Sequence, residues 1–134
     1  MKRGRISIEQ NIESGNISVQ IELVDNTVWL TKSEIARLFD VFSSSVRANL
    51  KIIFANKELF ETEVIRYETY KDNEGLSNTT EFYNLDVVIA LSFRLKGGYA
   101  RSFREWVRKQ ITKSIVNSNK VPIIIQLSSN QISN

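Results

Sequence analysis

The sequence contains no cysteine and no histidine among its 134 residues. Without cysteine the chain cannot form disulfides or thiolate metal sites, and without histidine it lacks the commonest proton shuttle and zinc ligand. These absences exclude a hydrolytic triad and an ordinary zinc site. We therefore predict a protein that is not an enzyme, with no catalytic residues, no metal and no cofactor.

Long hydrophobic runs are absent as well. No run approaches the roughly 18 apolar residues that a membrane span requires, and the opening MKRGRISIEQ lacks the apolar core of a secretory signal. We expect a cytoplasmic protein with no membrane partner. Its content of 42% hydrophobic and 25% charged residues is typical of one globular domain. We assign this domain to residues 1–116, and residues 117–134, rich in Asn, Ser and Gln, to a polar tail or linker.

Charge is unevenly distributed along the chain, although the net charge is only +3. Residues 55–86 carry three basic and eight acidic side chains, whereas residues 91–116 carry seven basic and one acidic. The second region has the charge that a polyanionic partner requires.

The first elements are predicted from apolar alternation and a capping motif. Residues 17–23 alternate and are followed by Asp25-Asn26 and a second short apolar run, which predicts a hairpin over 16–30. The sequence TKSE then places Thr31 three residues before Glu34, the spacing of a capping box, so a helix should begin at Lys32.

Two short helices joined by a tight turn are predicted next. Ser43 or Ser44 can cap the second helix, Ala36 is small where the helices cross, and Asp40 tolerates the left-handed turn conformation. The apolar positions are Ile35, Phe39, Val41, Val46 and Leu50. This spacing matches the helix-turn-helix pattern.

The remainder predicts a second hairpin over 61–84, which would form a structural wing, and two further helices. Asn84 should cap the first, which should run to Gly97-Gly98, and the last helix has an apolar face with Phe103 and Trp106 in the core. The predicted fold is α+β, a winged-helix-like helix-turn-helix with two β-hairpins and two C-terminal helices.

The candidate site lies around the second helix. Ser44, Ser45, Arg47, Ala48 and Lys51 are expected to contact base edges in the major groove of duplex DNA, where small hydroxyls and cations fit. We expect phosphate contacts from Ser43 and Lys32, and backbone contacts from a basic stripe. That stripe comprises Arg94, Arg101, Arg104 and Arg108. The alternatives are that the serines only cap a helix and that the stripe is a solvated face.

Three blocks, NTVWLTKSEIARLFDV, YNLDVVIALSFRL and FREWV, resemble the bacterial virulence protein RhuM family over Ile17 to Val116. This chain departs from that family at Asn49, usually a histidine, and at Ser92-Phe93, usually glycine-tyrosine. The resemblance implies a winged-helix-like DNA-binding domain from genes on mobile or pathogenicity islands. It also implies a longer protein, with an effector domain or protein partner missing from this chain.

These observations predict a sequence-specific duplex DNA-binding protein, a transcription or mobile-element regulator. Because a single small module binds specific DNA too weakly to compete with the genome, we expect a homodimer. The main alternative is a protein-interaction module, such as an antirepressor or antitoxin-like partner, that does not contact DNA. A metal-dependent nuclease using Glu58, Glu61, Glu63 and Glu68 is a weaker alternative.

Overall fold

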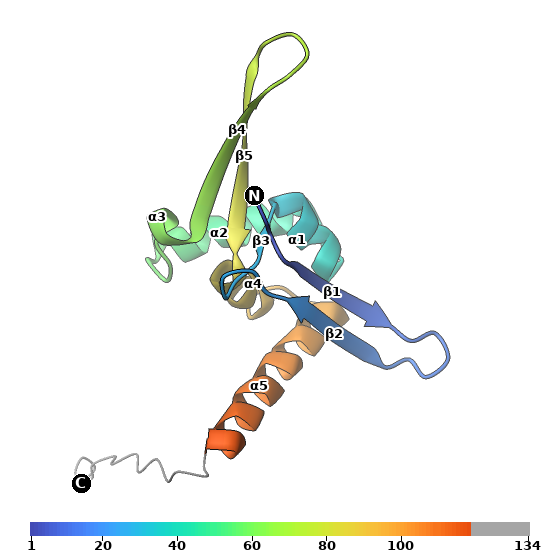
Figure 1. Ribbon diagram of the computed structural model, residues 1–134. Coiled ribbons are helices and arrows are strands. Elements are labelled where there is room, and N and C mark those ends of the chain that lie inside the picture. The colour runs from blue at the N-terminus through green and yellow to red at the C-terminus, as the bar shows by residue number, and fades with distance from the viewer. Residues whose placement is uncertain (119–134) are drawn as a thin grey trace, which may run out of the picture. The chain divides into compact units, whose positions relative to one another are not determined.

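The computed structural model describes residues 1–118, and Figure 1 labels the elements found there. In chain order they are β1 (Arg5–Gln10), β2 (Ile17–Glu22), β3 (Trp29–Leu30), α1 (Lys32–Phe39), α2 (Ser43–Ala55), α3 (Glu61–Val64), β4 (Ile65–Lys71), β5 (Ser77–Asn84), α4 (Leu85–Ser92) and α5 (Gly98–Ser118). Within these residues the chain forms two small antiparallel sheets and five helices. The predicted α+β class is confirmed.

The chain divides into two compact units, Met1–Arg104 and Glu105–Asn134, and the division falls inside α5. The first unit contains both sheets, α1 to α4 and the start of α5. The predicted tail, 117–134, lies outside the described residues apart from Asn117 and Ser118.

The three-stranded sheet has the strand order β3-β5-β4, with antiparallel pairing throughout. After β3 the chain forms α1, α2 and the single-turn α3, and it then returns as the β4-β5 hairpin, whose second strand pairs with β3. This order of strand, two helices and hairpin is winged-helix-like, with β4 and β5 as the wing. Figure 1 shows the wing extending away from the helices.

The predicted hairpin over 16–30 is wrong. β2 pairs instead with β1, in a register that places Arg5 opposite Glu22 and Gln10 opposite Ile17. The Asp25-Asn26 turn closes only an isolated bridge between Val24 and Thr27. Alternation identifies a strand but not its partner, and in the structure the Trp29–Leu30 strand β3 pairs with β5 instead of β2.

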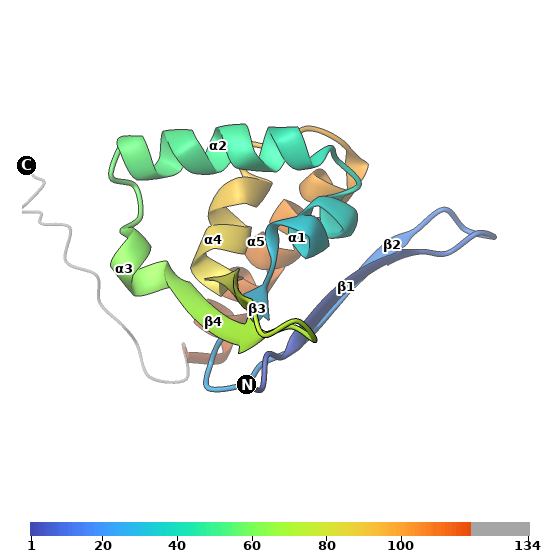
Figure 2. The same cartoon turned by 90° about the horizontal axis from the view of Figure 1, so that it is seen from above.

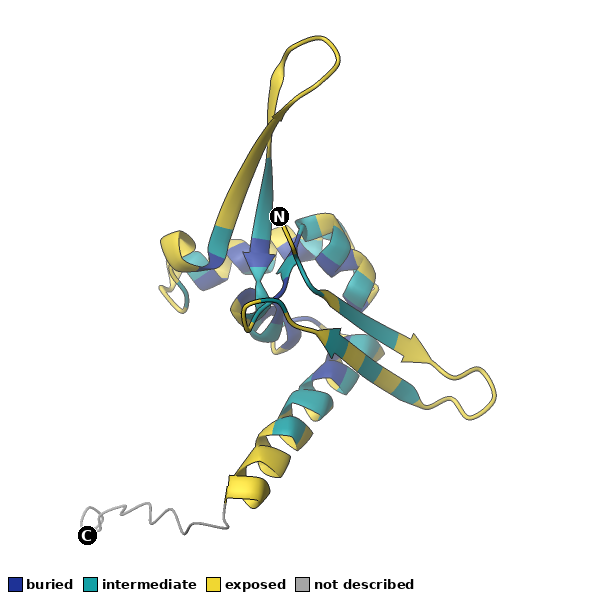
Figure 3. Ribbon diagram, viewed as in Figure 1, coloured by how far each residue is buried: buried dark blue, intermediate teal, exposed yellow. Residues whose placement is uncertain are grey.

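The core lies where the helices meet the base of the three-stranded sheet, as the buried positions in Figure 3 show. The predicted apolar face of the helix-turn-helix is confirmed at Ile35, Phe39, Val46 and Leu50, all of which are buried. Phe39 packs edge-to-face on Phe103 of α5, with ring centroids 5.6 Å apart. Such pairs contribute about 0.5 to 1.5 kcal/mol beyond their buried area. The helix-turn-helix therefore has a rigid inner face.

α4 begins as predicted but ends earlier. The Asn84 side chain accepts a hydrogen bond from the Val87 N–H, which confirms the cap. The helix stops at Ser92 instead of continuing to Gly97-Gly98. Arg104 of α5 donates at 2.5 Å to the carbonyl of Ser92, an acceptor that the helix end leaves without an intrahelical partner, and at 3.3 Å to the carbonyl of Leu95 in the segment that follows.

Candidate nucleic-acid interface

The start of α1 is fixed by the predicted capping box, which the structure confirms. The Thr31 hydroxyl accepts from the Glu34 N–H at 3.2 Å, and the Glu34 carboxylate accepts from the Thr31 N–H at 2.8 Å. Two free donors at the helix start are thereby satisfied by two side chains one turn apart.

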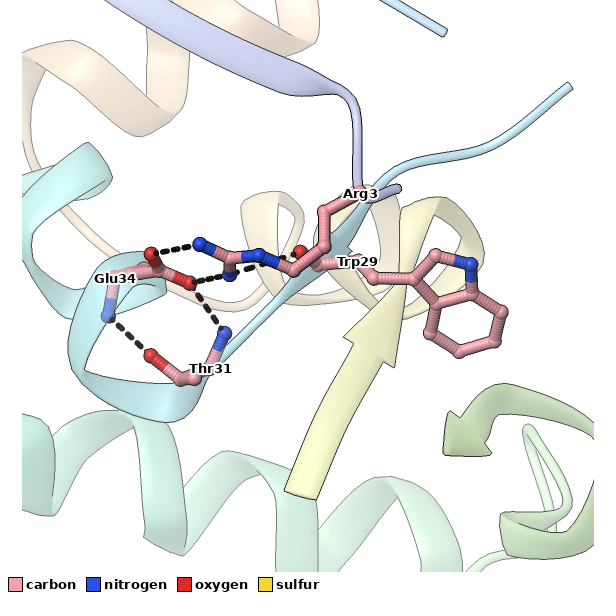
Figure 4. Close-up of polar contacts among 4 residues, drawn as sticks. All are labelled: Arg3, Trp29, Thr31 and Glu34. Carbon is pink, nitrogen blue, oxygen red and sulfur yellow. Dashed lines mark hydrogen bonds and ion pairs between the residues drawn. The ribbon is translucent and has the colours of Figure 1, made fainter. Parts of the chain in front are cut away.

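Glu34 is also bound by an arginine that the sequence patterns did not connect to it. The Arg3 guanidinium donates to both carboxylate oxygens, at 2.6 and 3.0 Å, and to the Trp29 carbonyl at 3.4 Å (Figure 4). Burial opposes ionisation of Glu34, but the hydrogen bonds from Arg3 and Thr31 outweigh it and hold the pKa of Glu34 below its ordinary value. We name Arg3, Thr31 and Glu34 the clasp; it joins the N-terminal segment to α1.

The turn between α1 and α2 has the left-handed conformation predicted for Asp40, with φ 54°. The Asp40 N–H donates to the Arg37 carbonyl and the Val41 N–H to the Ala36 carbonyl, the hydrogen bonds of a Schellman motif. Ala36 is only 5% exposed, so its small side chain permits the close approach of α2. The local chain thus sets the angle at which α2 leaves the turn.

The predicted serine caps of α2 are wrong. The N-cap residue is Phe42, and no side chain caps the helix. Serine hydroxyls at the first helical positions do not occupy the cap, because the N-cap residue is the one before them that retains extended backbone. The Phe42 carbonyl accepts from the Ser45 and Val46 N–H groups, whereas the Ser43 and Ser44 N–H groups have no hydrogen-bond acceptor within residues 1–118.

The outer face of α2 carries most of the predicted groove contacts. Ser44, Arg47, Ala48 and Lys51 are exposed, while Ser43 and Ser45 are half-buried. α2 contains no acidic residue, and no hydrogen bond or ion pair engages the Arg47 or Lys51 side chains within residues 1–118. Figure 2 shows α2 along the outer edge of the first unit. This face is positively charged and uncovered within that unit.

Other predicted DNA contacts are engaged inside the protein. Lys32 pairs with Glu81 of the wing at 3.7 Å, and Arg94 pairs with Glu58, which follows α2. Arg104 is held by the carbonyls at the end of α4, so its guanidinium supports the fold and its assignment to a phosphate-contacting stripe is corrected. Exposed side chains remain at Arg101 and, in the second unit, at Arg108.

The base of the wing is held by cations stacked on aromatic rings. The Arg66 guanidinium of β4 lies 4.4 Å from the centre of the Trp29 ring, and that of Arg3 lies 5.1 Å from the centre of the Phe82 ring. Each such contact contributes about 0.5 to 1 kcal/mol at exposed sites. These contacts couple the wing to the clasp and hence to α1.

The rest of the wing is acidic and polar. β4, β5 and their connection carry Glu68, Asp72, Glu74 and Glu81 against Arg66 and Lys71. At the tip, Asp72 accepts from the Leu76 and Glu74 N–H groups, which lowers the pKa of its carboxyl. This charge does not suit a phosphate-gripping wing, and the wing stays a structural element in our interpretation.

A hollow in the first unit lies between the β1-β2 hairpin and α1, with a volume of about 680 Å³. Its walls combine apolar side chains with charges of both signs, among them Ile6, Ile8, Leu38, Arg37 and Glu9. A surface of mixed charge has no preference for a polyanion.

Among the described residues no three acidic side chains are close enough to hold a metal ion, and no helix could cross a membrane.

Sequence reasoning overlooked two exposed residues, one directly before α2 and one on the wing. Phe42 is 82% exposed directly before α2, and Arg66 lies on the wing over Trp29. The signal for Phe42 was present, because an aromatic residue precedes three serines at a position where caps are usually polar.

Comparison of the chain with protein families, curated proteins and solved structures found no match. The resemblance to the RhuM family therefore stays a prediction.

Proposed function

We propose that this protein binds duplex DNA and reads its sequence with α2 in the major groove, as a bacterial regulator of transcription or of a mobile element. The observation that carries the proposal is the outer face of α2, where Ser44, Arg47, Ala48 and Lys51 are exposed without an acidic neighbour on the helix. Small side chains let the helix approach the bases, and the two cations match guanine edges or phosphates.

The surroundings of α2 support this proposal. The clasp, the Asp40 turn and the edge-to-face pair of Phe39 and Phe103 hold the helix-turn-helix without using any residue of the outer face. Reading bases requires side chains placed on a rigid element. We propose further that the protein acts in the cytoplasm as a homodimer, so that two copies of α2 read two half-sites, and that it shares this role with the RhuM family it resembles.

The test starts with selection of bound duplexes from a random pool, followed by titration of the selected duplex. Arg47→Ala and Lys51→Ala should each weaken binding by about 1 to 3 kcal/mol if the side chain contacts a base. If either contacts phosphate instead, its loss should reduce the salt slope of log K by roughly 0.9. An enriched motif with two half-sites would report the dimer.

Arg5→Ala is the matched control, because it removes the same charge from β1, where Arg5 is exposed and paired with Glu22. If binding depends only on net charge, Arg5→Ala will weaken it as much as the α2 variants do. Such equality, or unchanged affinity in both α2 variants, would refute α2 as the reading helix.

The alternative function is a protein-interaction module, and the hollow between β1-β2 and α1 is the observation that favours it. Leu38→Glu places a charge in this hollow while the outer face of α2 keeps its residues. If the protein fails to select any duplex and this variant abolishes binding to a protein partner, the interaction module replaces the DNA-binding proposal.

A further inference from the structure

Phe42 has the most exposed aromatic side chain among the described residues. Its side chain is 82% exposed, although aromatic rings gain more than most side chains from burial. Phe42 is the N-cap residue of α2, and its carbonyl accepts two hydrogen bonds from the first turn. Its phenyl ring has no oxygen that could accept a hydrogen bond from the free N–H groups of that turn. Ser, Thr, Asp or Asn at this position would stabilise the helix. The position thus breaks two folding preferences at once, which is expected where a residue serves binding.

The helix that begins directly after Phe42 indicates the chemistry of the partner. The next residues on the exposed side of α2 are Ser44, Arg47, Ala48 and Lys51, two of them cationic and none acidic. A hydrophobic protein partner would have to bury Arg47 and Lys51, which carry no counter-charge within residues 1–118. A polyanion pairs with these cations, and in duplex DNA the apolar group presented in the major groove is the C5-methyl group of thymine.

We propose that Phe42 is a specificity-determining residue that recognises thymine, with its ring packed on the C5-methyl group of a thymine in the major groove. This inference rests on the proposed DNA binding by α2 and adds the base that the helix start selects. Adenine, guanine and cytosine lack this methyl group, and a phenyl ring cannot pair with the donors and acceptors that they present there. Apolar wedges that separate base steps act from the minor groove, whereas the start of a reading helix enters the major groove.

The test replaces single thymines of the selected duplex by deoxyuridine, which removes only the methyl group. For the unsubstituted protein we expect at least one position per half-site where this change weakens binding about fourfold, as expected for one methyl-sized group. Phe42→Ser should bind the thymine and deoxyuridine duplexes equally at that position. It should also unfold at a higher urea concentration, because serine caps α2.

The matched control is Phe93→Ser, which makes the same change at another exposed phenylalanine, 64% exposed, at the end of α4. This variant should keep the thymine preference. The inference is overturned if no thymine position responds to deoxyuridine, or if Phe42→Ser keeps the thymine preference. If Phe42→Ser keeps this preference and loses self-association in sedimentation, the ring serves the dimer instead of base recognition. These results leave DNA binding by α2 intact, whereas failure of the unsubstituted protein to bind any duplex removes the proposed function and this inference together.

Discussion

The clasp makes a prediction that links the stability of the helix-turn-helix to pH. Glu34→Ala removes two hydrogen bonds from Arg3 and one from the Thr31 N–H. Loss of a capping-box partner costs about 0.5 to 1 kcal/mol. Because the Arg3 and Glu34 side chains are 36% and 27% exposed, solvent reduces their pairing to about 1 kcal/mol. We therefore expect Glu34→Ala to lower the free energy of unfolding by about 1.5 to 2 kcal/mol.

Equilibrium unfolding in urea at pH 7 measures this loss, and a double-mutant cycle isolates its ionic part. Arg3→Ala alone should cost about 1.5 to 2 kcal/mol, because the guanidinium also contacts the Phe82 ring. The double variant should show a coupling energy of about 1 kcal/mol between the two residues. Additive losses, with a coupling below about 0.3 kcal/mol, would refute the interpretation of the clasp as an energetic unit.

The same ion pair sets a pH dependence with a definite sign. The folded protein lowers the pKa of Glu34, so the folded state binds this proton less readily than the unfolded chain does. The stabilisation is present above the pKa of an ordinary glutamate, about 4.3, and is lost as the pH falls through the folded pKa. In Glu34→Gln this acid-dependent loss should shrink, and an unchanged pH profile in that variant would contradict the assignment.

Further changes test the turn, the N-terminal segment and the cap. Asp40→Gly should raise the free energy of unfolding by about 0.5 to 1 kcal/mol in urea, because glycine adopts the left-handed conformation without strain and a negative charge leaves the α1 C-terminus. Gly4→Ala should lower the free energy of unfolding by roughly 2 kcal/mol or more, because φ is +70° and a Cβ atom would lie 2.5 Å from the Glu22 carbonyl oxygen. An unchanged free energy of unfolding would refute this backbone conformation at Gly4. Phe42→Ser should raise it by about 1 kcal/mol, and thermal unfolding that shows a loss would contradict the cap geometry.

The sequence by itself determined the features that depend on residues within about one helical turn. Thr31 and Glu34 are three residues apart, Asp40 sets its own backbone conformation, and Asn84 caps the helix that follows it. Each was predicted because both partners of the interaction lie in one short segment. The apolar spacing of α1 and α2 likewise identified the inner face, and so left the outer face with Ser44, Arg47, Ala48 and Lys51 as the candidate site.

Only the tertiary structure decided which distant segments meet. β2 pairs with β1 and not with the following run, and Arg3 reaches Glu34 across 31 positions of sequence. Arg104 was expected to contact DNA but binds the end of α4, because a long cationic side chain reaches whichever acceptors the packing brings near. Alternation and charge patterns specify which positions of a segment are apolar or charged. Which other segment it pairs with depends on the summed packing of the whole unit.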